Sequence, residues 1–148
     1  MADYSIRKAA KTDAEILAKL AVKMWTGHTV PELAMDFRSV LNTEDAACFL
    51  LYAQAQAVGF AQCQLRHDYV EGTSTSPVGY LEGIFVEPSV RHRHLAKQLL
   101  TACENWAREK GCTEFASDCA LTNTDSIAFH QSVGFTEENR IVCFRKDL

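Results

Sequence analysis

A strand, a basic turn and a long amphipathic helix follow one another in the second half of the chain, and this succession constrains the fold most. Residues 78–86 are largely apolar and predict a strand closed by Pro88. Residues 93–110 carry apolar side chains at helical spacing, and Gly111 is a natural end for that helix. A further strand is expected at 113–119. This strand–helix–strand unit predicts a parallel pair joined by a right-handed crossover.

The rest of the chain predicts mostly antiparallel strands flanked by helices. The expected elements are a short strand at 5–7, helices over 12–25 and 31–41, strands at 46–53 and 57–67, a helix at 125–133 and a strand at 140–145. Asp13 is expected to cap the first helix. No linker or repeat divides the chain, so residues 1–148 are predicted to form one domain. The expected class is α+β, or mixed α/β.

Charge and composition exclude several classes of partner. The formal charge is −4, and an acidic chain lacks the basic surface that nucleic-acid binding needs. No apolar run is long enough to span a membrane and no signal peptide is evident, so a cytoplasmic protein is expected. The six cysteines form no C-x-x-C pair and no metal-ligand spacing, and they are interpreted as buried thiols.

The basic turn before the long helix is a candidate phosphate site. A helix N-terminus presents unpaired N–H groups and the positive end of the helix dipole. Arg91 and Arg93 add positive charge there, which suits a phosphate or pyrophosphate. The alternative is a helix start with solvated arginines, and the residues alone favour neither interpretation.

This stretch resembles the acetyl-CoA motif of the GNAT N-acetyltransferase superfamily, R/Q-x-x-G-x-G/A after a strand. The motif residues here are Arg91, His92, Arg93, His94, Leu95 and Ala96. His94 stands where the family has the glycine that lets the backbone approach the pyrophosphate. The resemblance implies a GNAT fold, in which the parallel strands splay at the acetyl-CoA site.

A second family element, N-x-x-A-x-x-L-Y-x-x-x-G-F, resembles residues 123–135. Asn123, Gly134 and Phe135 match, and His130 occupies the position of the family tyrosine. That tyrosine often donates a proton to the departing thiolate, which makes His130 a candidate catalytic residue. A histidine merely packed against the cofactor is the alternative. The resemblance also implies that Asn123 contacts the cofactor.

Four further segments resemble aminoglycoside 6′-N-acetyltransferases of the resistance type. They are residues 23–28, 65–72, 76–86 and 114–118. The resemblance implies acetyl-CoA as co-substrate without a metal, and a cationic amino sugar as acceptor. It is to the branch whose members are often dimers, so a homodimer is expected.

Two carboxylates stand where such an acceptor would need them. Glu82 lies in the middle of an otherwise apolar strand, and carboxylates are rarely buried without a partner or a role. It is a candidate base and substrate ligand, and the alternative is a carboxylate paired with an arginine across the sheet. Asp118 follows the neighbouring strand at its carboxyl end, where ligands bind parallel sheets. It is a second candidate anion for a polycation.

Aromatic and backbone groups complete the expected site. Trp25 at a helix end and Tyr69 in the long loop could pack on sugar rings or ammonium groups, although packed edge residues are as good an interpretation. Backbone groups of Ile84, Phe85 and Val86 are expected to hold the pantetheine arm, and an N–H there to polarise the thioester carbonyl.

Two other functions are compatible with the sequence. One is a GNAT acetyltransferase for another primary amine, such as a polyamine, a small metabolite or a protein. The other is a non-catalytic module that binds CoA, which the departures at His94 and His130 would allow.

Overall fold

The computed structural model describes residues 3–148, and its centre is one sheet of five strands in the order β1-β2-β3-β4-β5. The strands are β1 (Tyr4–Lys8), β2 (Ala46–Ala53), β3 (Gln56–Arg66), β4 (Val78–Val86) and β5 (Phe115–Ser117). The first four strands pair antiparallel, whereas β4 and β5 run parallel. The predicted mixed class and the parallel pair are therefore confirmed.

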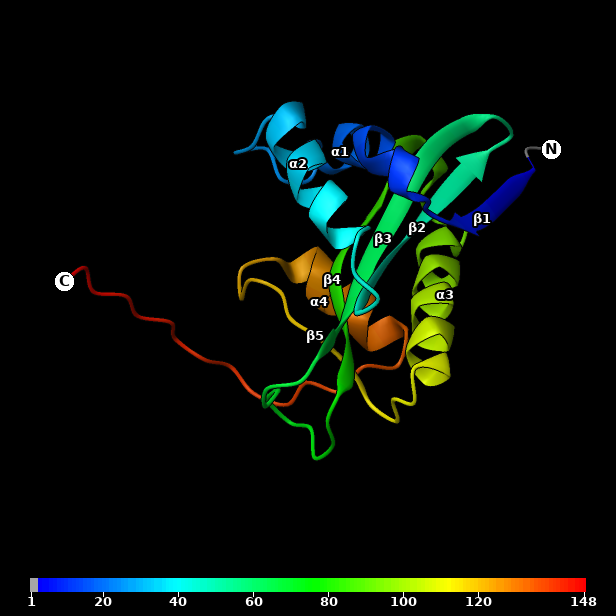
Figure 1. Ribbon diagram of the computed structural model, residues 1–148. Coiled ribbons are helices and arrows are strands. Elements are labelled where there is room, and N and C mark those ends of the chain that lie inside the picture. Colours follow the sequence, from blue (N-terminus) through cyan, green and yellow to red (C-terminus); the bar gives the residue numbers. More distant parts are fainter. Residues whose placement is uncertain (1–2) are drawn as a thin grey trace.

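Helices cover both faces of this sheet (Figure 1). The α-helices are α1 (Ala14–Ala21), α2 (Val30–Val40), α3 (Leu95–Glu109) and α4 (Thr124–Ser132). Two single 3-10 turns, η1 (Lys11–Asp13) and η2 (Pro88–Val90), precede α1 and follow β4. α1 and α2 pack against one face, and α3 connects the parallel strands across the other. None of the helices within residues 3–148 is both long and apolar enough to cross a bilayer.

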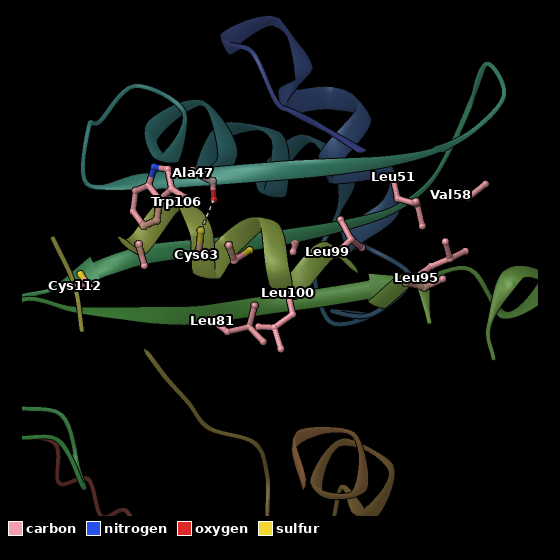
Figure 2. Packing of buried hydrophobic residues seen from close by; sticks show 14 residues of the cluster. Ala47, Leu51, Val58, Cys63, Leu81, Leu95, Leu99, Leu100, Trp106 and Cys112 are labelled. Carbon is pink, nitrogen blue, oxygen red and sulfur yellow. Dashed lines mark hydrogen bonds between the residues drawn. The ribbon is translucent and has the colours of Figure 1, made fainter. Parts of the chain in front are cut away.

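Side chains along β2 alternate between two hydrophobic cores. Ala47 and Leu51 belong to the core under α3, whereas Cys48 and Leu50 belong to the core under α1 and α2. This alternation follows from the two-residue period of a strand. The buried stripe predicted for the long helix is confirmed, and Figure 2 shows Leu95, Leu99, Leu100 and Trp106 packed over the strands.

The first helix departs from prediction at both ends. α1 ends at Ala21, and the chain then turns before α2 begins. As the N-cap residue of α1, Asp13 makes no side-chain hydrogen bond to that helix, so the predicted cap was wrong. Its carboxylate instead accepts hydrogen bonds from Arg7 at 2.7 and 2.9 Å and from the Ala10 amide at 2.6 Å. A charged guanidinium in a two-pronged contact is a stronger partner than a neutral amide.

The strand expected at 140–145 is absent from the structure. Residues after Phe135 form no helix or strand, and Figure 1 shows the C-terminal segment extending away from the sheet. Ile141, Val142 and Phe144 are 70%, 76% and 92% exposed. A strand needs a neighbour for its backbone groups, and no described strand of the same chain pairs with this segment.

The cysteines follow the prediction in part. Cys48, Cys63, Cys103 and Cys112 are buried free thiols, as expected. The other two, Cys119 and Cys143, are free but exposed, so the interpretation as buried thiols was wrong for them. Both lie inside expected strands, at 113–119 and 140–145, but β5 ends at Ser117 and the second strand does not form.

Candidate active site

β4 carries a bulge at Glu82. Gln62 and Cys63 are consecutive in β3, yet they pair with Gly83 and Leu81. Glu82 between these two residues therefore has no cross-strand partner. A bulge bends its strand and changes the direction of nearby side chains, and bulges often lie beside active sites.

The parallel pairing ends at the same point. β5 pairs with β4 only from Gly79 to Leu81, and the last pair joins Leu81 to Ser117. The edge of β4 from Glu82 to Val86 has no β5 partner among the residues described. Such an edge offers N–H and C=O groups to an extended ligand with amides of its own. This open edge includes the predicted cofactor-binding residues Ile84, Phe85 and Val86.

Four side chains link the bulge to the end of β5. Arg66 donates to Glu82 at 2.6, 3.1 and 3.2 Å, and its guanidinium lies 3.5 Å from the centre of the Tyr80 ring. The Tyr80 hydroxyl donates to Asp118 at 2.5 Å. The pairing of Glu82 with an arginine across the sheet, one of the two sequence interpretations, is therefore present. The chain of contacts also brings Glu82 and Asp118 to one region.

Tyr80 is the buried centre of this group. Burial raises the pKa of its hydroxyl well above the usual range, and the hydrogen bond to Asp118 raises it further. Tyr80 consequently stays a neutral donor and holds the Asp118 carboxylate in place. Neither Tyr80 nor Arg66 was among the site residues expected from sequence. The signal was available, because Tyr80 lies two positions before Glu82 and Arg66 ends the neighbouring strand.

Trp25 lies against the bulge, as its predicted place in the acceptor site requires. A Cβ on Gly83 would come within 2.8 Å of its ring, so only glycine allows this contact. Trp25 also lines a cavity of about 290 Å³ with Asp36 and Gln62, and the other lining residues are His28, Leu33, Phe37 and Val40. Asp36 adds a carboxylate that sequence reasoning missed, although it stands beside the apolar stripe of α2.

Tyr69 lies apart from these residues. Its side chain is 77% exposed, and its hydroxyl accepts a hydrogen bond from the Gly72 amide within the same loop at 3.4 Å. No described contact joins it to Trp25, Glu82 or Asp118. The structure therefore brings together three of the four predicted acceptor residues.

The basic turn at the start of α3 has an unusual backbone. His92 and His94 have φ of 63° and 60°, in the left-handed region that favours glycine. This conformation at His94 delays the helix to Leu95, later than predicted. Arg91 turns back to β4, where its Nε donates to the Val86 carbonyl at 2.8 Å. The basic turn before α3 is thus tied to the carboxyl end of β4.

α4 places the other family residues near the end of β5. The Asn123 side chain caps the helix by accepting from the Ser126 amide at 3.2 Å. His130 Nε2 lies 2.8 Å from the Ser117 hydroxyl, and its ring packs between Phe129 and Phe135. Ser117 is a contact that sequence reasoning did not anticipate. No group of three His, Cys, Asp or Glu side chains within residues 3–148 is arranged to hold a metal ion.

A mixed sheet whose parallel strands diverge beside a bulge and a basic helix N-terminus defines an acyl-CoA-dependent transferase of the GNAT type. Residues 13–135 match the Acetyltransferase (GNAT) family, and the chain belongs to that family.

Among its relatives are aminoglycoside N(6′)-acetyltransferases type 1. The protein from Salmonella enteritidis is 43% identical over 141 residues, which cover 95% of this chain and 97% of the relative. The protein from Acinetobacter haemolyticus is 38% identical over 144 residues, covering 97% and 99%. These alignments span nearly the whole of each protein.

Solved structures of aminoglycoside acetyltransferases are similar to this structure over nearly the whole chain. AAC(6′)-Iy in complex with CoA has a TM-score of 0.95 at 41% identity, covering all of this chain and 97% of the other. AAC(6′)-Iy in complex with the bisubstrate analogue CoA-S-monomethyl-acetylneamine has a TM-score of 0.93 at 42% identity, covering 99% of both chains. The expected GNAT fold is confirmed.

Proposed function

We propose that this protein transfers the acetyl group of acetyl-CoA to the 6′-amino group of an aminoglycoside. The observation that carries the proposal is the separation of charge on either side of the point where the β4–β5 pairing ends. Arg91 and Arg93 lie at the start of α3, whereas Glu82 and Asp118 lie where the strands diverge. Basic groups suit the cofactor phosphates, and carboxylates suit a polycationic sugar. The activity of the related proteins supports the same assignment.

Binding of acetyl-CoA follows from the open edge of β4. In this proposal the backbone of Ile84, Phe85 and Val86 holds the pantetheine arm. Residues 91–96 and the first amides of α3 bind the pyrophosphate, and Asn123 contacts the cofactor from α4. An N–H near the bulge polarises the thioester carbonyl, which stabilises the negative charge that develops as the amine attacks.

The acceptor approaches from the face covered by α1 and α2. Trp25, Glu82 and Asp118 meet there and would bind the ammonium groups and rings of the sugar. Tyr69 would join them from its exposed loop. Glu82, directly or through a water molecule, takes a proton from the incoming ammonium so that the amine becomes nucleophilic. His130 is the proposed proton donor on the cofactor side.

The ion pair with Arg66 allows the role of Glu82 to be isolated. We expect Glu82→Gln to lower kcat/KM for an aminoglycoside by at least about 100-fold, because the base and an anionic contact are lost together. Arg66→Gln breaks the same ion pair but keeps the carboxylate, so it is the matched control and should retain far more activity. Steady-state kinetics on both folded variants measures this.

Two results would contradict that role. Equal losses in the two variants would mean that the ion pair matters only to the structure. Unchanged kcat/KM in Glu82→Gln would remove Glu82 from the mechanism. Thermal unfolding and acetyl-CoA binding of each variant establish that the remaining site is intact.

A homodimer in the cytoplasm is the second part of the proposal. The exposed apolar segment at 141–144 supports it, since a strand-like sequence that pairs with no described strand of its own chain can pair with another copy. The four buried free thiols fit a reducing compartment.

A further inference from the structure

The imidazole of His130 is held at both nitrogens. Nδ1 lies 2.7 Å from the backbone carbonyl oxygen of Ser126, and Nε2 lies 2.8 Å from the hydroxyl oxygen of Ser117. The Ser117 hydroxyl in turn is 3.4 Å from the Leu81 carbonyl oxygen. Three polar contacts thus run in series from α4 through β5 to β4.

The number of protons available determines which atom donates in each of these hydrogen bonds. A carbonyl oxygen only accepts, so Nδ1 carries the proton toward Ser126 and the Ser117 hydroxyl carries the proton toward Leu81. The Ser117 oxygen must then accept from Nε2. All three hydrogen bonds exist together only when both nitrogens of His130 carry a proton. In that arrangement a proton can pass from Nε2 to the Ser117 oxygen.

This series of contacts lies where the β4–β5 pairing ends. Ser117 and Leu81 form the last pair before β4 and β5 diverge, and the bulge at Glu82 follows at once. The Ser117 hydroxyl is consequently at the point where the pairing of β4 and β5 ends. The rings of Phe129 and Phe135 flank His130, with centroids 5.7 and 5.1 Å from it.

The carboxylates nearest to His130 in the fold either pair with other residues or are exposed to solvent. Glu82 pairs with Arg66, and Asp118 accepts from Tyr80 on the acceptor side of β5. Asp125 lies in the first turn of α4 and is exposed. No described salt bridge or hydrogen bond joins these carboxylates to His130.

We propose that Ser117 and His130 act as a proton relay to the sulfur of the departing CoA, with Ser117 as the group that touches it. This inference rests on acetyl transfer from acetyl-CoA, not on the identity of the acceptor. When the carbon–sulfur bond breaks, its electron pair goes to sulfur, which takes the Ser117 hydroxyl proton. The serine oxygen takes the Nε2 proton, and neutral His130 later recovers a proton from solvent. Ser117 thereby delivers the proton that a tyrosine hydroxyl supplies in the family pattern.

The relay can be tested without any acceptor. Its donors stabilise a thiolate, so the thiol of CoA bound to the protein should ionise at lower pH than that of free CoA. Ultraviolet absorbance of the thiolate, followed against pH in the binary complex, measures this. We expect Ser117→Ala to move the ionisation upward by about one pH unit or more. Ser132→Ala on the same helix is the matched control, because its hydroxyl donates to the Phe129 carbonyl at 2.7 Å and takes no part in the series, and it should behave like the wild type.

Kinetics provides the second readout. Ser117→Ala and His130→Phe should each lower kcat by about 10- to 100-fold with KM for acetyl-CoA within about 3-fold, and the double variant should lose little more. Ser117→Thr keeps the hydroxyl and should retain activity, which separates the relay from a packing effect. Identical thiol ionisation in wild type and Ser117→Ala would overturn the relay. Wild-type protein that shows the thiol effect but acetylates no aminoglycoside would instead overturn the proposed acceptor.

Discussion

Asp13 is the one buried carboxylate among the residues described, and its surroundings explain why it is tolerated there. The Arg7 guanidinium beside it lowers the pKa of the carboxyl, and the Ala10 amide contributes in the same direction. Removing one partner of such a pair leaves the other charge unpaired. Because the Arg7 side chain is 46% exposed, water compensates part of the loss.

We therefore expect Asp13→Asn to lower the free energy of unfolding by about 2 kcal/mol at pH 7. The folded-state pKa is depressed, so the contribution is fully present above the ordinary aspartate pKa, near 4, and is lost as the pH falls through the lowered value. Urea unfolding at several pH values measures this. The gap between wild type and variant should close toward pH 2, and a constant gap would contradict the account. Asp147→Asn, in an exposed pair with Arg145, should change little.

The left-handed backbone of His94 at the start of α3 predicts an effect of a glycine substitution on the stability of the helix. A left-handed residue other than glycine costs about 1 kcal/mol, and His94 is in that conformation at the first turn. His94→Gly should maintain or raise stability by up to about 1 kcal/mol and keep or improve affinity for acetyl-CoA. Thermal unfolding and calorimetric titration measure the two effects.

A glycine substitution at a helical position of α3 is the control for the left-handed position of His94. Gln98→Gly should lower stability by about 1 kcal/mol, because Gln98 is helical and exposed. A clear loss of acetyl-CoA affinity in His94→Gly would show instead that the imidazole itself binds the cofactor.

Elements were predictable from sequence where local pattern and tertiary context agree. The strand at 78–86 and the helix at 31–41 have clear apolar periods, and the structure has them within about one residue. The predictions failed where a residue outside the local segment determines the structure. Asp13 was predicted to cap a helix, but Arg7 in β1 takes its carboxylate. The segment at 140–145 has the pattern of a strand, but no strand within residues 3–148 pairs with it.

The candidate site shows the same division. Glu82 and Asp118 stand out in the sequence, because each is a carboxylate at the edge or middle of an apolar strand. Ser117 does not stand out, since its importance comes from its pairing with Leu81 and from its contact with His130 on α4. The bulge that isolates Glu82 is a property of two strands together, and one strand alone does not reveal it.

At the scale of the whole molecule, the exposed C-terminal segment is the feature that a single copy leaves unexplained. If it pairs with a second copy, a chain ending at Asn139 should be monomeric, whereas the full chain should be dimeric. Light scattering after size-exclusion chromatography measures both masses. Phe144→Asp, a single change to a 92% exposed residue, should weaken the dimer without unfolding the chain. A dimer of unchanged mass in the shortened chain would contradict this role.

In the proposed reaction, the 6′-amine of the aminoglycoside is the position that is acetylated. The most direct measurement compares two aminoglycosides that differ only at the 6′ position, one with an amine and one with a hydroxyl, by release of free CoA thiol and mass of the product. We expect acetylation of the 6′-amine and none, or far slower transfer, for the hydroxyl analogue. Equal rates with both compounds, or CoA release only with a polyamine or protein acceptor, would contradict it.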